Sequence, residues 1–271
     1  MPMKFKKYDG CGNTFAIILD EEGLDFSQLA IEICHHEEMN TDGFIVVKQN
    51  PLEMVFYNRD GSLAPMCGNG IRSFAKYVID EGVVTADKKV FNVVTGAGLL
   101  MVEVIDVDPF LCQIAMGKPV FTPESVFLAD DGPLNRTLEI GTESVDIYSL
   151  FMGTVHTVIF VDDAPAMVGC FLAKAVCEHP LFTEKTNVNF VQVKSSSEFI
   201  VRTYERGVGW TLACGTGCCA SYVVAKKLGI INQNEINVLL EQGALTISGT
   251  EEIYMTGPAK YHHTLELELE A

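Results

Sequence analysis

Two cysteines occupy the same place in a repeated stretch of the chain. Cys67 lies in Met66-Cys67-Gly68-Asn69-Gly70, and Cys214 lies in Ala213-Cys214-Gly215-Thr216-Gly217. Each precedes a Gly-x-Gly that opens into an apolar pattern with helical spacing. The amides and dipole of a helix N-terminus stabilise anions, so both positions predict a thiol with a lowered pKa and amides able to hold a carboxylate. The alternative is a pair of buried, inert cysteines.

Two such thiols on opposite sides of one carbon suit a single type of chemistry. One thiolate removes a proton from a stereocentre, the opposite thiol delivers a proton to the other face, and the roles exchange in the reverse direction. A carboxylate held at the helix N-termini also stabilises the charge that develops on the carbon acid. This chemistry requires no cofactor in principle.

The elements around the cysteines recur at an offset of 140 to 147 residues. Tyr57 and Tyr204 each lie ten residues before their cysteine, and three further segments correspond in the same order. A period of this size indicates two homologous halves and not a solenoid. We expect one half at 1–118, completed by a C-terminal strand at 264–271, and the other at 119–263.

Hydrophobic periodicity predicts the same elements in each half. Gly82 and Gly229 are expected to end the two helices that follow the cysteines. The helix after Cys214 is apolar on nearly all sides and should therefore be buried all round. Helices are predicted at 24–36, 70–80, 166–177 and 217–228, and strands at 15–19, 43–48, 53–57, 90–95, 99–104, 111–116, 157–160, 190–194, 199–204, 237–240, 244–247, 253–255 and 264–270.

Composition limits the partners and the compartment. The formal net charge of -17 argues against nucleic acid and anionic membranes, which would repel the chain. The N-terminal stretch lacks the apolar core of a signal peptide, and no apolar run reaches the roughly 18 residues of a membrane span, so we expect a cytoplasmic protein. The nine cysteines are irregularly spaced, without CxxC pairs or HExxH, and we expect no metal site.

The motifs together resemble those of the diaminopimelate epimerase family, the two-cysteine amino-acid racemases that need no cofactor. The resemblance covers essentially the whole chain. It implies an α/β (α+β) fold of two pseudo-symmetric domains, each a curved, mostly antiparallel sheet wrapped around a central helix, with the site between them. It also implies a small amino-acid substrate and a homodimer. The motifs are Gly10-Cys11-Gly12-Asn13, Asp60-Gly61-Ser62, Cys67-Gly68-Asn69-Gly70-Ile71-Arg72, Asn187-Val188-Asn189-Phe190-Val191-Gln192 and Tyr204-Glu205-Arg206-Gly207-Val208-Gly209, which leads into the stretch around Cys214.

The resemblance also implies roles for individual residues. Cys67 and Cys214 would be the acid/base pair, with Gly68, Asn69, Gly215 and Thr216 around the carboxylate of the reacting centre. His156 would lie near the thiols, although a buried, satisfied histidine is an equal alternative. The substrate pocket would be lined by Asn13, Asn58, Asn187, Glu205 and Arg206; the alternatives are turn or strand-end residues for the asparagines and a surface ion pair for the last two.

Three positions depart from the family pattern. Thr14 stands where the family usually has aspartate, Thr154 where it has the asparagine that helps to bind the far carboxylate, and Trp210 where it has an acidic residue. These changes predict a racemase with a substrate other than diaminopimelate, and histidine is the first candidate. Diaminopimelate epimerase itself is the alternative, and a non-catalytic or thiol-redox protein is a third hypothesis. A related isomerase branch lacks both cysteines, so their presence argues against it.

Overall fold

The computed structural model describes residues 3–85 and 87–268. The chain divides into two compact units, Met1–Ile114 with Thr256–Ala271 (unit 1) and Ala115–Met255 (unit 2). The divisions fall inside the strands β8 (Phe110–Gly117) and β17 (Ile253–Pro258). The strand predicted at 264–271 overlaps β18 (Lys260–Leu267) in unit 1, and residues 269–271 lie outside the described residues.

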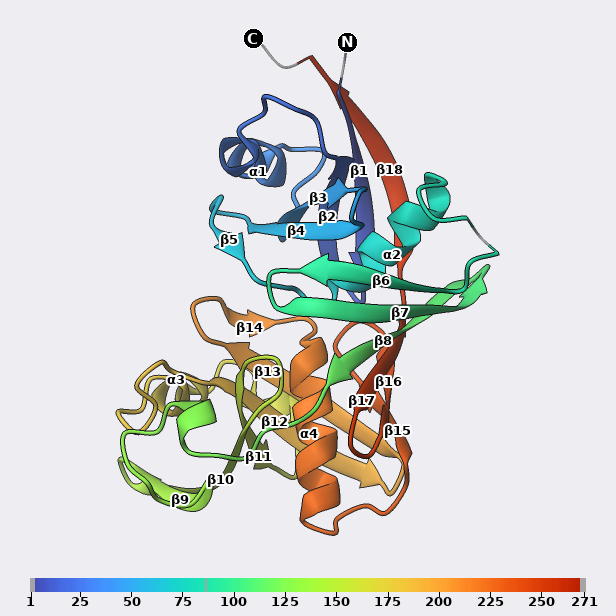
Figure 1. The fold of residues 1–271 in the computed structure, drawn as a ribbon. Coiled ribbons are helices and arrows are strands. Elements are labelled where there is room, and N and C mark those ends of the chain that lie inside the picture. Colours follow the sequence, from blue (N-terminus) through green and yellow to red (C-terminus); the bar gives the residue numbers. More distant parts are fainter. Residues whose placement is uncertain (1–2, 86, 269–271) are drawn as a thin grey trace. The chain divides into compact units, whose positions relative to one another are not determined.

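Unit 1 is a mostly antiparallel sheet whose strand order is β18-β1-β2-β3-β4-β6-β7-β8 (Figure 1). Only the β2/β3 and β4/β6 pairs in this order are parallel. The short β5 pairs antiparallel with the end of β4. The remaining elements are β1 (Met3–Gly10), β2 (Asn13–Leu19), α1 (Phe26–His35), β3 (Gly43–Lys48), β4 (Glu53–Asn58), β5 (Leu63–Ala64), α2 (Gly70–Asp80), β6 (Val90–Thr95) and β7 (Gly98–Val107).

Unit 2 repeats this topology in the order β9-β10-β11-β12-β13-β15-β16, and the short β14 pairs antiparallel with the end of β13. Two strand pairs in this order are parallel, β11/β12 and β13/β15, and they correspond to β2/β3 and β4/β6 of unit 1. Two 3₁₀ turns lie at Glu124–Val126 and Pro165–Met167. The other elements are β9 (Asn135–Ile140), β10 (Glu143–Phe151), β11 (Val155–Phe160), α3 (Phe171–Cys177), β12 (Asn187–Ser195), β13 (Glu198–Glu205), β14 (Gly209–Thr211), α4 (Gly215–Lys227), β15 (Glu235–Leu239) and β16 (Ala244–Gly249).

One helix in each unit is enclosed by the sheet. α2 contacts β1, β2, β3, β4 and β18, and α4 contacts β10, β11, β12, β13 and β16. Every residue of α4 from Gly215 to Ala225 is buried, as its apolar sequence predicts. Gly82 and Gly229 follow these helices in the left-handed region, with φ of 67° and 72°. Each α/β unit thus wraps a mostly antiparallel sheet around a central helix, which confirms the predicted fold class.

The second helix of each unit covers the opposite face of the sheet. Leu29 and Ile33 of α1 pack on β1, β2 and β3, and Leu172 and Val176 of α3 pack on β9 to β12. The helix predicted at 166–177 is interrupted because Gly169 adopts a φ of 85°, so the first turn is 3₁₀ and α3 begins only at Phe171.

Several strands lie where none was predicted: β1, β5, β9, β10 and β14. In β9 and β10, buried Leu138, Ile140, Val145 and Ile147 recur at every second residue between polar neighbours. This alternation is typical of a strand with one solvated face, and it could have identified both. β1 is rich in lysine, which obscures the same signal.

Candidate active site

Cys67 lies in the tight loop that begins α2. The backbone amide of Gly70 donates to its Sγ atom at 3.4 Å, and its carbonyl accepts the amide of Ile71 at 3.0 Å. A Cβ at Gly70 would lie 3.2 Å from the Cβ of Cys67, so this position favours glycine. The Cys67 thiol is therefore held against a backbone amide at the N-terminus of α2.

Buried side chains fix the loop that carries Cys67. Asn69 donates from Nδ2 to Oδ1 of Asn13 at 2.9 Å. The fully buried Arg72 donates from Nη1 to the Gly68 carbonyl at 3.1 Å and to Oδ1 of Asn69 at 3.2 Å, and from Nε to the Pro258 carbonyl at 3.2 Å. Three of the predicted site residues, Asn13, Gly68 and Asn69, are thus connected in one cluster with Arg72.

Asn58 and Thr14 make local contacts in unit 1. Asn58 donates from Nδ2 to Oγ of Ser62 at 3.0 Å and shapes the turn after β4, where its backbone amide also bonds the Ser62 carbonyl. The backbone amide of Thr14 donates to Oδ2 of Asp42 at 2.8 Å, and Asn13 donates to the same oxygen at 3.4 Å. Asp42, which sequence reasoning missed, therefore orients the strand that presents Asn13.

Cys214 is the N-cap of α4 and is only 6% exposed. Its Sγ atom lies 3.5 Å from Oγ1 of Thr216. Burial and the neighbouring Glu205 carboxylate raise the pKa of the Cys214 thiol well above its usual value, against the opposing effects of Thr216 and the Gly217 amide. The sequence-based prediction of a lowered pKa is therefore wrong for Cys214, because desolvation outweighs the helix N-terminus.

Glu205 lies at the end of β13, beside Cys214. Its Oε1 atom accepts the hydroxyl of Thr211 at 2.7 Å. Burial raises the pKa of the Glu205 carboxyl, while hydrogen bonds from Thr211 and Cys214 oppose this shift. The carboxylate is thus part of the immediate surroundings of the thiol and not half of a surface ion pair.

Arg206 forms a second polar cluster with Asn187 and Thr154. Its backbone amide donates to Oδ1 of Asn187 at 2.9 Å. Its guanidinium donates from Nη1 to the Glu184 carbonyl at 2.7 Å and from Nη2 to Oγ1 of Thr154 at 3.1 Å. Gly153 lies against Thr216, because a Cβ there would be 3.4 Å from its Cγ2 atom. The cluster is therefore adjacent to the first turn of α4.

His156 lies on β11, where it is fully buried and contacts the side-chain amide of Asn189. Nδ2 of Asn189 lies 3.1 Å from Nδ1 of His156. Burial and the nearby Arg206 cation lower the pKa of the imidazole to about 3, so the ring is neutral at physiological pH. Among the described residues, its Nε2 atom has no hydrogen-bond partner.

Trp210 points away from this cluster. On the antiparallel β13/β14 pair it lies opposite Tyr204, and side chains directly opposite share a face of the sheet. Its ring packs on Phe190 and Tyr204, each with centroids 5.7 Å away, in the apolar core that α3 covers. Thr211 and Glu205 project from the other face, toward Cys214. Trp210, one of the three departures from the family pattern, therefore packs in this core and not beside Glu205 and Cys214.

Each unit thus gathers its own set of predicted residues around its cysteine. Sequence reasoning did not select Asp42, Arg72, Asn189 or Thr211 as site residues. Arg72 and Asn189 belong to motifs quoted above, and the position of Arg72 directly after Ile71 in the motif that begins α2 is a signal that could have identified it. The set in unit 1 is Cys67, Gly68, Asn69 and Asn13, with Thr14 next to Asn13 on β2 and Asn58 at the end of β4; the set in unit 2 is Cys214, Gly215, Thr216, Glu205, Arg206, Asn187, Thr154 and His156.

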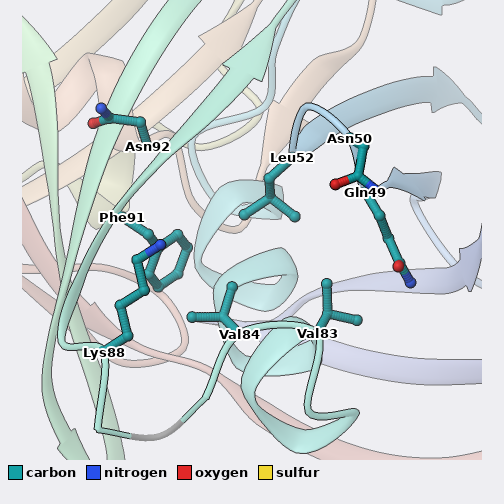
Figure 2. Close-up of a pocket in the computed structure, with 8 residues that line it drawn as sticks. All are labelled: Gln49, Asn50, Leu52, Val83, Val84, Lys88, Phe91 and Asn92. Carbon is teal, nitrogen blue, oxygen red and sulfur yellow. The ribbon is translucent and has the colours of Figure 1, made fainter.

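A cavity of about 370 Å³ lies elsewhere in unit 1 (Figure 2). It is bordered by the β3–β4 turn and by the segment between α2 and β6, with Leu52, Val84 and Phe91 as its apolar lining and Asn50 and Lys88 among its polar residues. None of the candidate site residues lines it. Within the described residues, no group of three or more metal-ligating side chains is found, and no helix is long and apolar enough to cross a membrane.

Comparison with known proteins agrees with the two-cysteine motifs. The family model described as diaminopimelate epimerase matches residues 5–122 and 148–262. Diaminopimelate epimerase of Alkaliphilus metalliredigens is 40% identical over 273 residues, which cover 96% of this chain and 95% of that one. The chain belongs to the diaminopimelate epimerase family. The enzyme of the same name from Halothermothrix orenii is 38% identical, with 97% of both chains covered.

Solved structures with low sequence identity share the fold of this family member. A phenazine biosynthesis protein of the PhzF family from Bacillus anthracis superposes with a TM-score of 0.74 at 14% identity, covering 99% of this chain and 100% of that one. A probable proline racemase from Agrobacterium radiobacter gives 0.71 at 10% identity, covering 99% and 93%. Family membership makes this chain an isomerase of the racemase/epimerase type with an amino acid as its small-molecule substrate, in agreement with the class predicted from the cysteines.

Proposed function

We propose that this enzyme is a diaminopimelate epimerase that inverts one α-carbon of diaminopimelate with Cys67 and Cys214 as its acid/base pair. The observation that carries the proposal is the near full-length similarity of 38–40% to enzymes of that name. Each cysteine precedes a helix enclosed by its own sheet. That shared setting supports a common role for the two thiols.

The sequence-based prediction of a diverged substrate, with histidine as first candidate, is not supported. It rested on Thr14, Thr154 and Trp210. Trp210 packs on the face of the β13/β14 pair opposite to that of Glu205. Thr154, although it replaces an asparagine, still contacts the Arg206 guanidinium. The backbone and not the side chain of Thr14 bonds Asp42. The relatives named above therefore favour diaminopimelate.

Arg206 supports a substrate with a second carboxylate. The bonds to Glu184 and Thr154 occupy two of the five N–H donors of the guanidinium and fix its plane. The backbone of the same residue is anchored to Asn187. A planar cation held in this way is suited to bidentate binding of a carboxylate, whereas histidine and lysine offer no second carboxylate.

The thiols would carry out the reaction as paired proton transfers. In one direction a thiolate takes the α-proton, and the opposing thiol gives its proton to the other face of the planar carbon. The raised pKa of Cys214 favours its protonated form in the free enzyme, so Cys214 is ready to act as the acid. Backbone amides at Gly215 and Thr216 would hold the α-carboxylate and stabilise the developing carbanion.

Exchange of the α-proton in heavy water, followed by NMR, tests both the chemistry and the substrate. The purified enzyme is incubated without pyridoxal phosphate, separately with LL-diaminopimelate, meso-diaminopimelate, L-histidine and L-lysine. We expect exchange and epimerisation with the two diaminopimelates alone. Exchange with histidine would overturn the proposed substrate, and exchange with none of the four would overturn the proposed activity.

Serine variants test the roles of the cysteines. Cys67→Ser and Cys214→Ser should each abolish epimerisation in both directions, because either proton transfer alone cannot invert the centre. Cys170→Ser, a partly buried cysteine before α3, is the matched control and should retain activity. Full epimerisation by either of the first two variants would contradict the two-thiol mechanism.

The family resemblance also supports a homodimer, which stays a prediction for this chain. Analytical ultracentrifugation of the purified protein tests it: we expect a species of twice the chain mass of 29.7 kDa. A concentration-independent monomer would contradict it.

A further inference from the structure

Asn189 occupies a fully buried position between His156 and the first turn of α4. Its Nδ2 atom lies 3.1 Å from Nδ1 of His156 and 3.1 Å from the Thr157 carbonyl, and its Oδ1 atom lies 3.0 Å from the hydroxyl of Thr203. A carbonyl oxygen can only accept a hydrogen bond. The nitrogen of the amide must therefore face Thr157, which fixes the orientation of the Asn189 side chain.

This orientation determines the tautomer of His156. The Asn189 nitrogen is a donor only, so Nδ1 of His156 has to be the acceptor and carries no proton. In a neutral ring the proton then resides on Nε2. That buried N–H has no hydrogen-bond partner among the described residues, and a buried donor without a partner destabilises the folded protein. The Nε2–H of His156 is therefore available to donate to a ligand that carries a hydrogen-bond acceptor.

The amide of Asn189 also lies directly against α4. A Cβ placed on Gly217 would be only 2.2 Å from Oδ1 of Asn189 and 3.2 Å from Oγ1 of Thr203. Gly217 is three residues after Cys214, in the turn whose amides face the reacting centre in the proposed function. Asn189 therefore connects the imidazole to the helix turn that follows the Cys214 thiol.

We propose that Asn189 is a positioning residue for the epimerase reaction, which holds His156 as the neutral Nε2–H tautomer so that this N–H donates to the substrate carboxylate bound at the N-terminus of α4. This inference rests on the proposed function for the identity of the acceptor. The tautomer itself is a property of the substrate-free enzyme. Arg206 is the charged group whose field acts on the ring, and it disfavours a second proton on the imidazole.

Nitrogen NMR of protein labelled with ¹⁵N-histidine tests the tautomer directly. The His156 signals are assigned from their loss in His156→Gln. In the wild-type enzyme we expect a protonated Nε2 and an unprotonated Nδ1, unchanged between pH 5 and pH 8. An Nδ1–H tautomer, or an imidazolium at pH 7, would overturn the inference. This measurement needs no substrate, so it stands apart from the heavy-water exchange that tests the proposed function.

Substitutions then separate positioning from folding. In Asn189→Asp the carboxylate cannot donate to Nδ1, so we expect Nδ1 to become protonated and kcat/KM for diaminopimelate to fall about tenfold, with a new ionisation in the pH profile. His156→Gln can place an N–H near Nε2, whereas His156→Asn can replace only Nδ1. We expect the glutamine variant to retain at least tenfold more activity than the asparagine variant; equal activities, with both variants folded, would refute the role of Nε2–H.

Discussion

The carboxylate of Glu205 lies beside the thiol of Cys214 and raises the pKa of that thiol, in the same direction as burial does. The helix N-terminus and the Thr216 hydroxyl act in the opposite direction and are too weak to compensate. A position at a helix N-terminus is therefore not sufficient to make a cysteine a thiolate. The local charge and the loss of water decide its protonation state.

Glu205→Gln should lower the pKa of Cys214, because the neutral amide no longer disfavours the thiolate. The pH at which Cys214 reacts with iodoacetamide should shift downward, measured by peptide mass spectrometry so that the other cysteines are distinguished. Glu198→Gln on the same strand is the control and should leave the profile unchanged, since Glu198 lies at the other end of β13. An unchanged or raised pKa in Glu205→Gln would contradict the assigned effect.

Thr154→Val should weaken substrate binding through Arg206. The change removes the hydroxyl that accepts Nη2 at 3.1 Å and leaves a guanidinium donor unpaired. A hydrogen bond to a charged group contributes about 1.5–3 kcal/mol, so we expect KM for diaminopimelate to rise about tenfold or more with little change in kcat. Thr137→Val on β9 serves as a control; an unchanged KM in Thr154→Val would show that this contact does not orient Arg206.

Trp210→Phe should affect stability and not substrate choice. The smaller ring leaves a void against Phe190 and Tyr204 in the core under α3, which we expect to lower the free energy of unfolding by about 1–2 kcal/mol in chemical denaturation. The ratio of activities on diaminopimelate and histidine should stay as in the wild type. A gain in histidine racemisation would restore Trp210 as a specificity residue.

Arg72→Met should destabilise unit 1 and disturb the loop that carries Cys67. The change removes three hydrogen bonds from a fully buried guanidinium, including those to Gly68 and Asn69. We expect a loss of about 2–4 kcal/mol in unfolding free energy, measured by denaturant titration. Lys76→Met on the same helix removes a partly exposed ion pair with Asp80 and a cation–π contact with Phe110 and should cost less than about 1 kcal/mol; equal losses would mean that Arg72 has no special structural role.

The internal repeat was visible in the sequence because the same apolar periodicities and turn residues recur around Cys67 and Cys214. It predicted the helix 70–80, with the bounds that α2 has, and the enclosed helix after Cys214. The strands β9 and β10 were not predicted, since polar residues on their solvated face dilute the apolar signal. The sequence also did not show on which face of its strand Trp210 lies, because this depends on the pairing register, which sets Trp210 opposite Tyr204.

Local patterns of residue types and spacing in the sequence predicted the two homologous halves and the repeated cysteine motif, and the resemblance of its motifs predicted the fold class and the racemase/epimerase class. The tertiary structure decided the environment of each thiol and the contacts of its neighbours. Desolvation of Cys214 by the surrounding sheet and the approach of Glu205 from β13 reverse the pKa shift that the helix terminus alone predicts. Burial and charge at one atom depend on residues far apart in the chain, and only folding brings them together.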